Sequence, residues 1–249
     1  LLNKNNVQSI DFSIFESEYK MLKNKNSVDT SSKVLNSIDT WKKTIYPKSD
    51  GQNKYIQAVN EYDVIFGLGP AGTGKSYLAV AKAVQSLKKG HIDKIILSRP
   101  AVEAGENLGF LPGDMKDKVD PYLRPIYDAL YEMIPFEIVE KKIQEGIIEI
   151  APVAFMRGRT FKNSFIIIDE AQNTSSIQMK MILTRLGYGS KMIINGDLTQ
   201  IDIKYINDSG LSTAKKKLSN LKTIKFINLN KKDVVRHKIV SEIISAYEK

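Results

Sequence analysis

The sequence contains no cysteine and only two histidines, His91 and His237, among its 249 residues. Without cysteine the chain has no disulfides, no thiolate metal sites and no cysteine nucleophile, which agrees with a reducing compartment. With two imidazoles only, a histidine-rich metal centre is not expected. We therefore look to carboxylates, hydroxyls and lysines for chemistry.

Long apolar runs are missing as well. The longest, such as residues 165–168, fall far short of the roughly 18 residues that a membrane-spanning helix needs, and the N-terminus lacks a signal-peptide pattern. We expect a cytoplasmic protein that does not enter membranes. Hydrophobic residues make up 42% and charged residues 26% of the chain, which is enough apolar material for one large α/β domain.

The net charge of +9 is unevenly distributed. Residues 1–50 carry 8 basic and 6 acidic groups, residues 51–200 carry 18 and 17, and residues 201–249 carry 11 and 5. The C-terminal excess, which includes residues 215–217 and 231–232, can neutralise the phosphates of RNA or DNA. A solvated lysine-rich surface explains it equally well.

One segment carries a complete phosphate-binding motif. Its residues match G-x-x-x-x-G-K-[ST] and are Gly69, Pro70, Ala71, Gly72, Thr73, Gly74, Lys75 and Ser76. An apolar run at residues 64–66 precedes the loop and helical spacing from Tyr77 to residue 84 follows it, so strand, loop and helix appear in the required order. A glycine-rich turn that merely caps a helix explains less of this pattern.

The motif assigns roles to its members. The backbone N–H groups of the loop would surround the β-phosphate of ATP at the positive end of the helix. Lys75 would reach the β- and γ-phosphates, and Ser76 would ligate Mg²⁺. We therefore predict that residues 69–77 bind ATP.

A second apolar strand, residues 166–168, ends in the carboxylates Asp169 and Glu170. Asp169 would hold Mg²⁺ and Glu170 would polarise the attacking water, because phosphoryl transfer depends mainly on positioning and charge neutralisation. An Asp-Glu pair at a strand end is often only solvated. About 95 residues after a complete phosphate loop, in the same α/β pattern, we favour the catalytic interpretation.

Two glutamines are weaker candidates. Gln200 follows a further apolar strand that ends in Gly196-Asp197, where it would sense the γ-phosphate or orient water, although an exposed turn residue explains it better when it is taken alone. Gln52 lies 17 residues before Gly69, where a side-chain amide can read the adenine edge. By itself that signal is weak.

The regular alternation of short apolar runs with helical segments predicts an α/β fold with a parallel sheet covered by helices. The predicted strands are 63–67, 94–98, 147–150, 164–169, 191–195 and 223–228. After the helix that follows the phosphate loop, the predicted helices are 121–133, 136–145, 176–186, 209–219 and 233–248.

Two regions fall outside this pattern. Residues 1–44 are rich in Asn, Lys and Ser and are interpreted as a weakly structured arm with short helices at 12–22 and 34–41, which leaves 45–249 as the ATPase domain. Residues 99–120 contain prolines and glycines with little periodicity. We predict that they form a long functional loop.

Taken together, Gln52, the phosphate loop, residues 169–172 and residues 196–200 resemble the first motor domain of superfamily 1 helicases. Three further segments narrow the resemblance to the PhoH-like ATPase family, over about residues 46–247. They are SRPAVEAGENLGFLPG at 98–113, APVAFMRGRTF at 151–161 and Val235-Arg236-His237.

This resemblance implies a P-loop NTPase of the RecA and helicase type with a single motor domain. It also implies a cytoplasmic ATP-binding protein, in a family often linked to phosphate-starvation regulons and, in several members, to RNA metabolism. Members commonly form rings, for example hexamers. A single motor domain lacks the second domain that normally supplies an arginine to the γ-phosphate. A neighbouring subunit of an oligomer can supply this arginine instead.

Arg236 is the first candidate for this arginine finger, with Arg157 and Arg159 as alternatives, although a surface salt bridge explains Arg236 equally well. The leading functional prediction is an oligomeric, Mg²⁺-dependent ATPase that remodels RNA or an RNA–protein assembly. A nucleotide-gated binding module with slow turnover is the main alternative. A P-loop kinase acting on a small molecule fits less well, because the Asp169-Glu170 pair suits water better than an acceptor hydroxyl.

Overall fold

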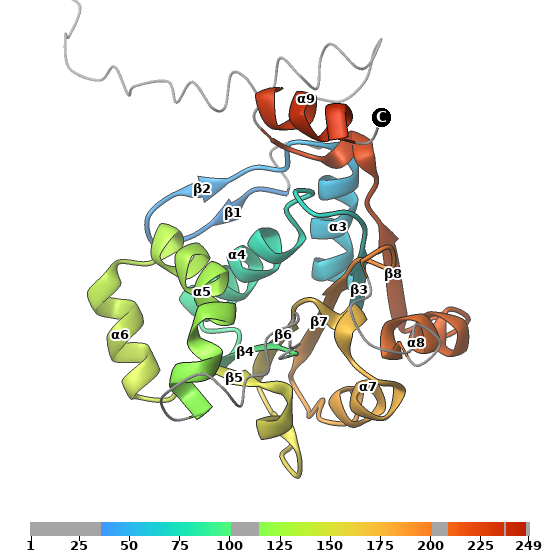
Figure 1. The fold of residues 1–249 in the computed structure, drawn as a ribbon. Coiled ribbons are helices and arrows are strands. Elements are labelled where there is room, and N and C mark those ends of the chain that lie inside the picture. The colour runs from blue at the N-terminus through green and yellow to red at the C-terminus, as the bar shows by residue number, and fades with distance from the viewer. Residues whose placement is uncertain (1–35, 101–114, 201–208, 237, 248–249) are drawn as a thin grey trace, which may run out of the picture.

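The computed structural model describes residues 36–100, 115–200, 209–236 and 238–247. A six-stranded parallel sheet with strand order β5-β4-β6-β7-β3-β8 forms the centre, and helices cover both of its faces (Figure 1). The strands are β3 (Val64–Leu68), β4 (Lys94–Arg99), β5 (Ile148–Pro152), β6 (Ser164–Ile168), β7 (Lys191–Gly196) and β8 (Ile224–Asn228). The predicted parallel sheet is confirmed, with each strand close to its expected range.

Both faces of the sheet are buried, which is why its strands read as continuous apolar runs. Successive side chains of a strand point to opposite faces of the sheet, so Ile167 packs into one hydrophobic core and Ile166 into the other. The first core lies under α3 (Asp50–Glu61), α4 (Lys75–Lys88), α5 (Met115–Met133) and α6 (Phe136–Gln144). The second lies under α7 (Ser176–Leu183) and α8 (Gly210–Leu218).

The helix predicted at residues 34–41 is wrong over its described part. Ile38–Asp39 forms β1, which pairs antiparallel with β2 (Thr44–Ile45). The Thr40 hydroxyl donates to the Lys43 carbonyl over 2.6 Å, and this local bond closes a turn that competes with a helix. Ile38 is fully buried in the first core, so the hairpin packs on the domain. The helix predicted at 12–22 lies outside the described residues.

Some helices differ from the prediction in their bounds, and one helix was not predicted. α5 begins at Met115, so the end of the predicted 99–120 loop is helical, while 101–114 lie outside the described residues. α3 was not anticipated. It begins after Ser49, whose hydroxyl accepts a hydrogen bond from the Gln52 backbone N–H over 3.2 Å.

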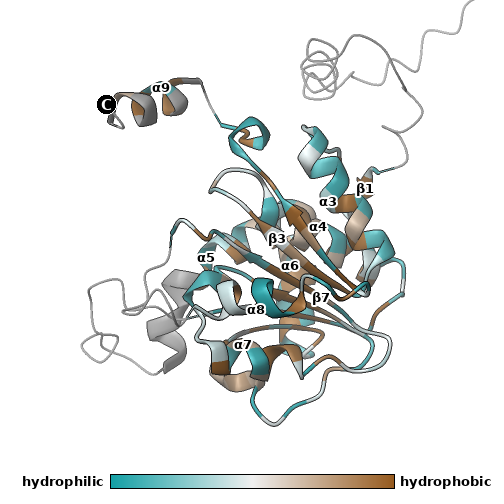
Figure 2. Ribbon diagram, turned by 90° about the vertical axis from the view of Figure 1, so that its right-hand side faces the viewer, coloured by the Kyte–Doolittle hydropathy of each residue, from teal (hydrophilic) through white to brown (hydrophobic). Residues whose placement is uncertain are grey.

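The last predicted helix starts later than expected. Asn230 and Asp233 cap each other across the short 3₁₀ turn η5 (Lys231–Asp233), and α9 (Lys238–Tyr247) begins only after it. α9 stands apart from the sheet, whose apolar strands lie between more hydrophilic helices (Figure 2). Within the described residues, no helix is both long and apolar enough to cross a bilayer.

Candidate functional site

The phosphate loop connects β3 to α4 at the carboxyl edge of the sheet. Gly69, Gly72 and Gly74 have φ values of 149°, 82° and 80°, in the region that favours glycine. A Cβ on Gly69 would also overlap the Leu229 carbonyl oxygen. The loop therefore needs glycine both for its backbone conformation and for the close approach of the chain that follows β8.

Lys75 folds back into the loop. Its Nζ donates to the carbonyl oxygens of Gly69 and Pro70 over 2.5 and 2.9 Å. Burial lowers the pKa of Lys75, and the nearby carboxylate of Asp197 is the strongest opposing influence. The ammonium is thus held inside the cradle where the motif requires a cation for phosphate oxygens.

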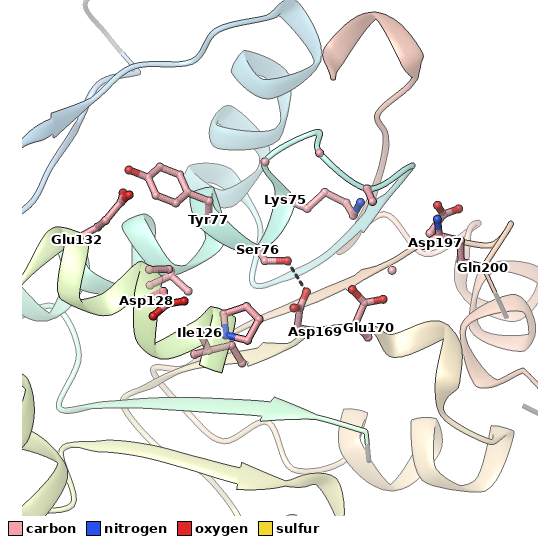
Figure 3. A pocket seen from close by; sticks show the side chains of 17 residues that line it. Lys75, Ser76, Tyr77, Ile126, Asp128, Glu132, Asp169, Glu170, Asp197 and Gln200 are labelled. Atoms are coloured by element: carbon pink, nitrogen blue, oxygen red, sulfur yellow. Dashed lines mark hydrogen bonds between the residues drawn. The ribbon is translucent and has the colours of Figure 1, made fainter. Parts of the chain in front are cut away.

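Ser76 and Asp169 meet across the sheet edge. The Ser76 hydroxyl donates to Asp169 Oδ1 over 2.5 Å, as Figure 3 shows. Asp169 is buried, and this burial raises the pKa of its carboxyl. These are the two predicted metal ligands, and the structure brings them together.

The donor set fits Mg²⁺. In the described part of the chain no three His, Cys, Asp or Glu side chains converge into a metal cage. A hydroxyl beside one carboxylate at a phosphate loop is the type of partial site in which Mg²⁺ takes its remaining ligands from water and nucleotide phosphates. Ser76 and Asp169 would hold the ion, which would neutralise charge on those phosphates.

Glu170 has an unusual backbone conformation, with φ 52° and ψ 39°. Such left-handed geometry is unfavourable for a non-glycine residue and often occurs at functional sites. Arg99 at the end of β4 lies 3.5 Å from one carboxylate oxygen, and the Gln172 amide donates to the other over 2.5 Å. Two neighbours therefore orient the predicted water-activating carboxylate.

Sequence reasoning gave no role to Gln172 or to the contact made by Arg99. Gln172 is buried, and its Oε1 accepts from the Asp197 backbone N–H over 3.0 Å while its amide reaches Glu170. This side chain therefore joins the ends of β6 and β7. Its place two residues after Glu170 was visible in the sequence, but the bridge depends on β6 and β7 being neighbours.

A cleft of about 470 Å³ is lined by Lys75, Ser76, Asp169 and Glu170 (Figure 3). Lys75, Glu170 and Asp197 surround one end, and the exposed Gln200 lines the same end. Asp197 is buried and accepts from the backbone and the hydroxyl of Thr199, which fixes the turn that leads to Gln200. Gln200 therefore lines the same cleft as Asp169 and Glu170, and its contact with the γ-phosphate or with water stays a prediction.

Tyr77 lines the other end of the cleft and points toward Glu132 of α5, away from Lys75 (Figure 3). Lys43 forms an ion pair with Glu132 over 2.7 Å and lies 5.5 Å from the centre of the Tyr77 ring. The β1–β2 hairpin therefore helps to build this wall. Burial raises the pKa of Tyr77.

Gln52 lies behind the phosphate loop. Its amide nitrogen donates to the Thr73 carbonyl over 3.0 Å, and its oxygen accepts from the Lys48 backbone N–H over 2.7 Å. The side chain is buried. Gln52 is therefore next to the predicted site, in a position that supports the loop, and its reading of adenine stays a prediction.

The segment after β8 lies against the phosphate loop of its own chain. The Val235 backbone N–H donates to the Gly72 carbonyl over 2.9 Å, and a Cβ on Gly72 would overlap the Arg236 guanidinium. Buried Asp233 anchors this segment by accepting from the Ser49 hydroxyl over 2.7 Å and from the Gly51 N–H over 3.1 Å. Arg236 thus lies against the phosphate loop of its own chain, and its role as an arginine finger stays a prediction.

The two alternative arginines lie elsewhere. Arg159 forms a bidentate ion pair with Glu149 on β5 and stacks 4.6 Å from the Phe161 ring centre. Arg157 is exposed. None of the three arginines lines the cleft, and Arg236 differs from the other two in lying against Gly72 of the phosphate loop.

Comparisons with known proteins agree with this geometry. A family model described as PhoH-like protein matches residues 44–248. A PhoH-like protein of Bacillus subtilis is 59% identical over 207 residues, which cover 83% of this chain and 65% of that protein. Protein PhoH of Escherichia coli K12 is 40% identical over 205 residues, 82% of this chain and 58% of that protein.

The chain thus spans less than two thirds of the length of these relatives. Among solved structures, the Pif1 helicase of Candida albicans is similar with a TM-score of 0.40 and 16% identity, over 79% of this chain and 42% of that chain. With a cleft built from a phosphate loop and a facing carboxylate pair, and with a family match over most of its length, this chain belongs to the PhoH-like protein family.

Proposed function

We propose that this protein hydrolyses ATP with Mg²⁺ and that, as a homo-oligomer, it couples hydrolysis to the remodelling of RNA or of an RNA–protein assembly. The observation that carries the proposal is the convergence of Lys75, Ser76–Asp169 and Glu170 in one cleft. A loop that only bound nucleotide would not require an oriented carboxylate beside it.

Each residue has a distinct task in this proposal. Lys75 neutralises charge on the β- and γ-phosphates, and Ser76 with Asp169 holds the metal. Glu170 accepts a hydrogen bond from water and aligns it with the γ-phosphate. Arg99 and Gln172 hold that carboxylate in position. Gln200, which lines the same cleft, contacts the γ-phosphate or the water in this proposal.

Glu170→Gln tests the hydrolytic assignment. The amide keeps the shape of the side chain but accepts a proton poorly, so ATP binding persists while turnover falls by about 100-fold or more. Glu137→Gln on exposed α6 is the matched control and leaves both unchanged. Wild-type turnover in Glu170→Gln would show that another group activates the water.

The C-terminal charge supports the RNA part of the proposal. Lys216 and Lys217 at the end of α8, Lys225 on the outer strand β8, and Lys231 and Lys232 in η5 are all exposed. Some of this charge complements the α8 dipole. A backbone-binding face built from such lysines would give strongly salt-dependent affinity.

The test is ATP turnover with and without single-stranded RNA, at low and at physiological salt, on protein of measured oligomeric mass. We expect RNA to stimulate turnover several-fold at low salt and less at physiological salt. Without stimulation at either salt, the RNA coupling fails and a nucleotide-gated switch that responds to a protein partner is favoured. Release of free phosphate from ATP alone excludes the small-molecule kinase.

The oligomer is supported by the apolar surface around α9. Ile239 and Ile243 on the helix are 56% and 51% exposed, and Val235 just before it is 40% exposed. Contiguous exposed apolar residues of this kind mark contact surfaces. A ring such as a hexamer would bury them, and Ile239→Asp with Ile243→Asp should then reduce the measured mass to that of a smaller species.

A further inference from the structure

A second cavity of about 530 Å³ lies at the amino edge of the sheet, away from the phosphate loop. The starts of β3 and β7 and the second half of α4 form its walls. Since α4 is 14 residues long, its two ends lie about 20 Å apart. The helix that begins at the ATP cleft therefore reaches this second cavity with its other end.

The cavity is strongly basic. Lys82 of α4, Lys89 at the C-cap of that helix, Lys191 of β7 and His91 line it, and Asp63 is the one carboxylate among its lining residues. Gln85, Ser86 and Ser190 add neutral polar groups. Three lysines opposite one aspartate leave an excess of two positive charges in a concave space.

Lys82 is the most informative member of this group. It is partly buried, and its Nζ donates to Gln85 Oε1 over 2.6 Å. In the part of the chain that the structure describes, no carboxylate lies within salt-bridge distance of Lys82. A lysine that is withdrawn from water without an anionic partner is costly, so its position calls for an explanation.

Simple structural reasons account for only part of the cluster. Lys88 and Lys89 at the end of α4 complement the helix dipole. Lys82 lies well before the last turn, and Lys191 belongs to a strand and donates to the Tyr62 carbonyl. An exposed lysine would extend its ammonium into solvent, whereas these two line a shared cavity.

We propose that this cavity binds a small phosphate compound with two or more negative charges, such as pyrophosphate, with Lys82, Lys89 and Lys191 as its cationic ligands. The volume suits a small molecule and not a folded partner. Ammonium groups bind phosphate oxygens by charge-assisted hydrogen bonds, and Gln85 and Ser86 supply further polar groups. An anion there would supply the partner that Lys82 lacks.

Protonation of Lys82 should accompany binding. Burial, followed by the positive charges of Lys89 and Lys191, lowers the pKa of Lys82 to about 8. Asp63 and His91 are the other titratable groups that face the cavity. Because an anion stabilises the protonated amine, pyrophosphate binding at pH 8.5 should take up a proton, and affinity should fall as the pH rises above 8.

The test is pyrophosphate titration by calorimetry at low salt, in a Lys75→Ala background that weakens anion binding at the phosphate loop. Lys82→Met and Lys89→Met should each reduce affinity by about tenfold or more, since each removes a charged contact. Lys54→Met, on the exposed face of α3, is the matched control and should bind as the parent does. Lys89 is exposed, so its replacement does not threaten folding.

Equal affinity in the Lys82, Lys89 and Lys54 variants, or no binding in the parent, would overturn the proposal. Binding of single-stranded RNA, but not of pyrophosphate, that depends on Lys82 and Lys89 would also overturn it in favour of a nucleic-acid contact. The proposal does not rely on ATP hydrolysis, so failure of Glu170→Gln to stop turnover would leave it intact.

Discussion

The Ser76 hydroxyl and the Asp169 carboxylate are hydrogen-bonded over 2.5 Å although 93 positions separate them in the chain. They come from the helix after β3 and from the end of β6, and β7 lies between these strands. Because the strands are parallel, β7 delivers Asp197 and Gln200 into the gap at the same edge. This strand order builds a cleft with a phosphate loop on one side and a carboxylate pair on the other.

Gly72→Ala should disrupt nucleotide binding. Alanine at φ 82° costs about 1–2 kcal/mol of backbone strain, and its Cβ would displace the Arg236 guanidinium. Gly146→Ala is the matched control, because Gly146 has φ 67° but nothing within 4 Å of the added carbon. Thermal melting should show similar losses in both variants, and nucleotide titration should show a loss of ATP affinity in Gly72→Ala alone. Equal affinities would mean that the loop tolerates the added carbon.

Arg236 should act within its own chain. Arg236→Ala is expected to reduce turnover by about 100-fold or more, because an arginine that contacts the transferred phosphate stabilises the charge of the transition state. Mixed oligomers distinguish the two geometries. Subunits with Lys75→Ala keep Arg236, and subunits with Arg236→Ala keep an intact phosphate loop. If Arg236 acted on a neighbour's ATP, mixing the two variants would therefore restore part of the activity. We expect no restoration after subunit exchange, with exchange verified by differently tagged chains.

Gln172→Ala should impair catalysis without removing a group that touches ATP. Glu170 loses a hydrogen bond, and the buried Asp197 backbone N–H loses its acceptor, at a cost of about 1–3 kcal/mol in stability. We expect turnover to fall by about tenfold or more while the KM for ATP changes little. Gln178→Ala, which removes an exposed cap of α7, should lower stability only slightly and leave turnover unchanged. If turnover per folded molecule were unchanged in Gln172→Ala, the role of Gln172 would be purely structural.

Lys82→Met should stabilise the protein at neutral pH. The folded-state pKa of Lys82 is lowered to about 8 from an unfolded value near 10.5, so the protonated amine destabilises the fold at every pH below 8. The cost disappears as the pH rises from 8 toward 10.5, where the amine is neutral in both states. The gain in thermal midpoint of Lys82→Met over wild type should therefore be present at pH 7 and shrink above pH 8. A gain that is constant across this range would point to packing and not to charge.

Strands were easier to predict than the segments that flank the domain. β6 is fully buried and is apolar after Ser164, so its pattern was unambiguous. The β1–β2 hairpin buries two apolar side chains, Ile38 and Ile45, and the backbone N–H and hydroxyl of Thr40 close its turn by donating to the Lys43 carbonyl, which sequence spacing does not reveal. α9 begins only after η5, because the side chains of Asn230 and Asp233 accept hydrogen bonds from backbone N–H groups of this turn. The Asp233 carboxylate also accepts from the Gly51 N–H of α3.

The sequence by itself determined the α/β class, the family and the residues of the phosphate loop with its carboxylate pair. These follow from contiguous motifs, in which the chemistry and the backbone requirement lie within a few residues. Only the tertiary structure decided that Gln172 joins Glu170 to Asp197, that Arg236 lies on the loop of its own chain and that three lysines share one cavity. Strand order and packing bring such side chains together from distant segments, and no local pattern encodes that proximity.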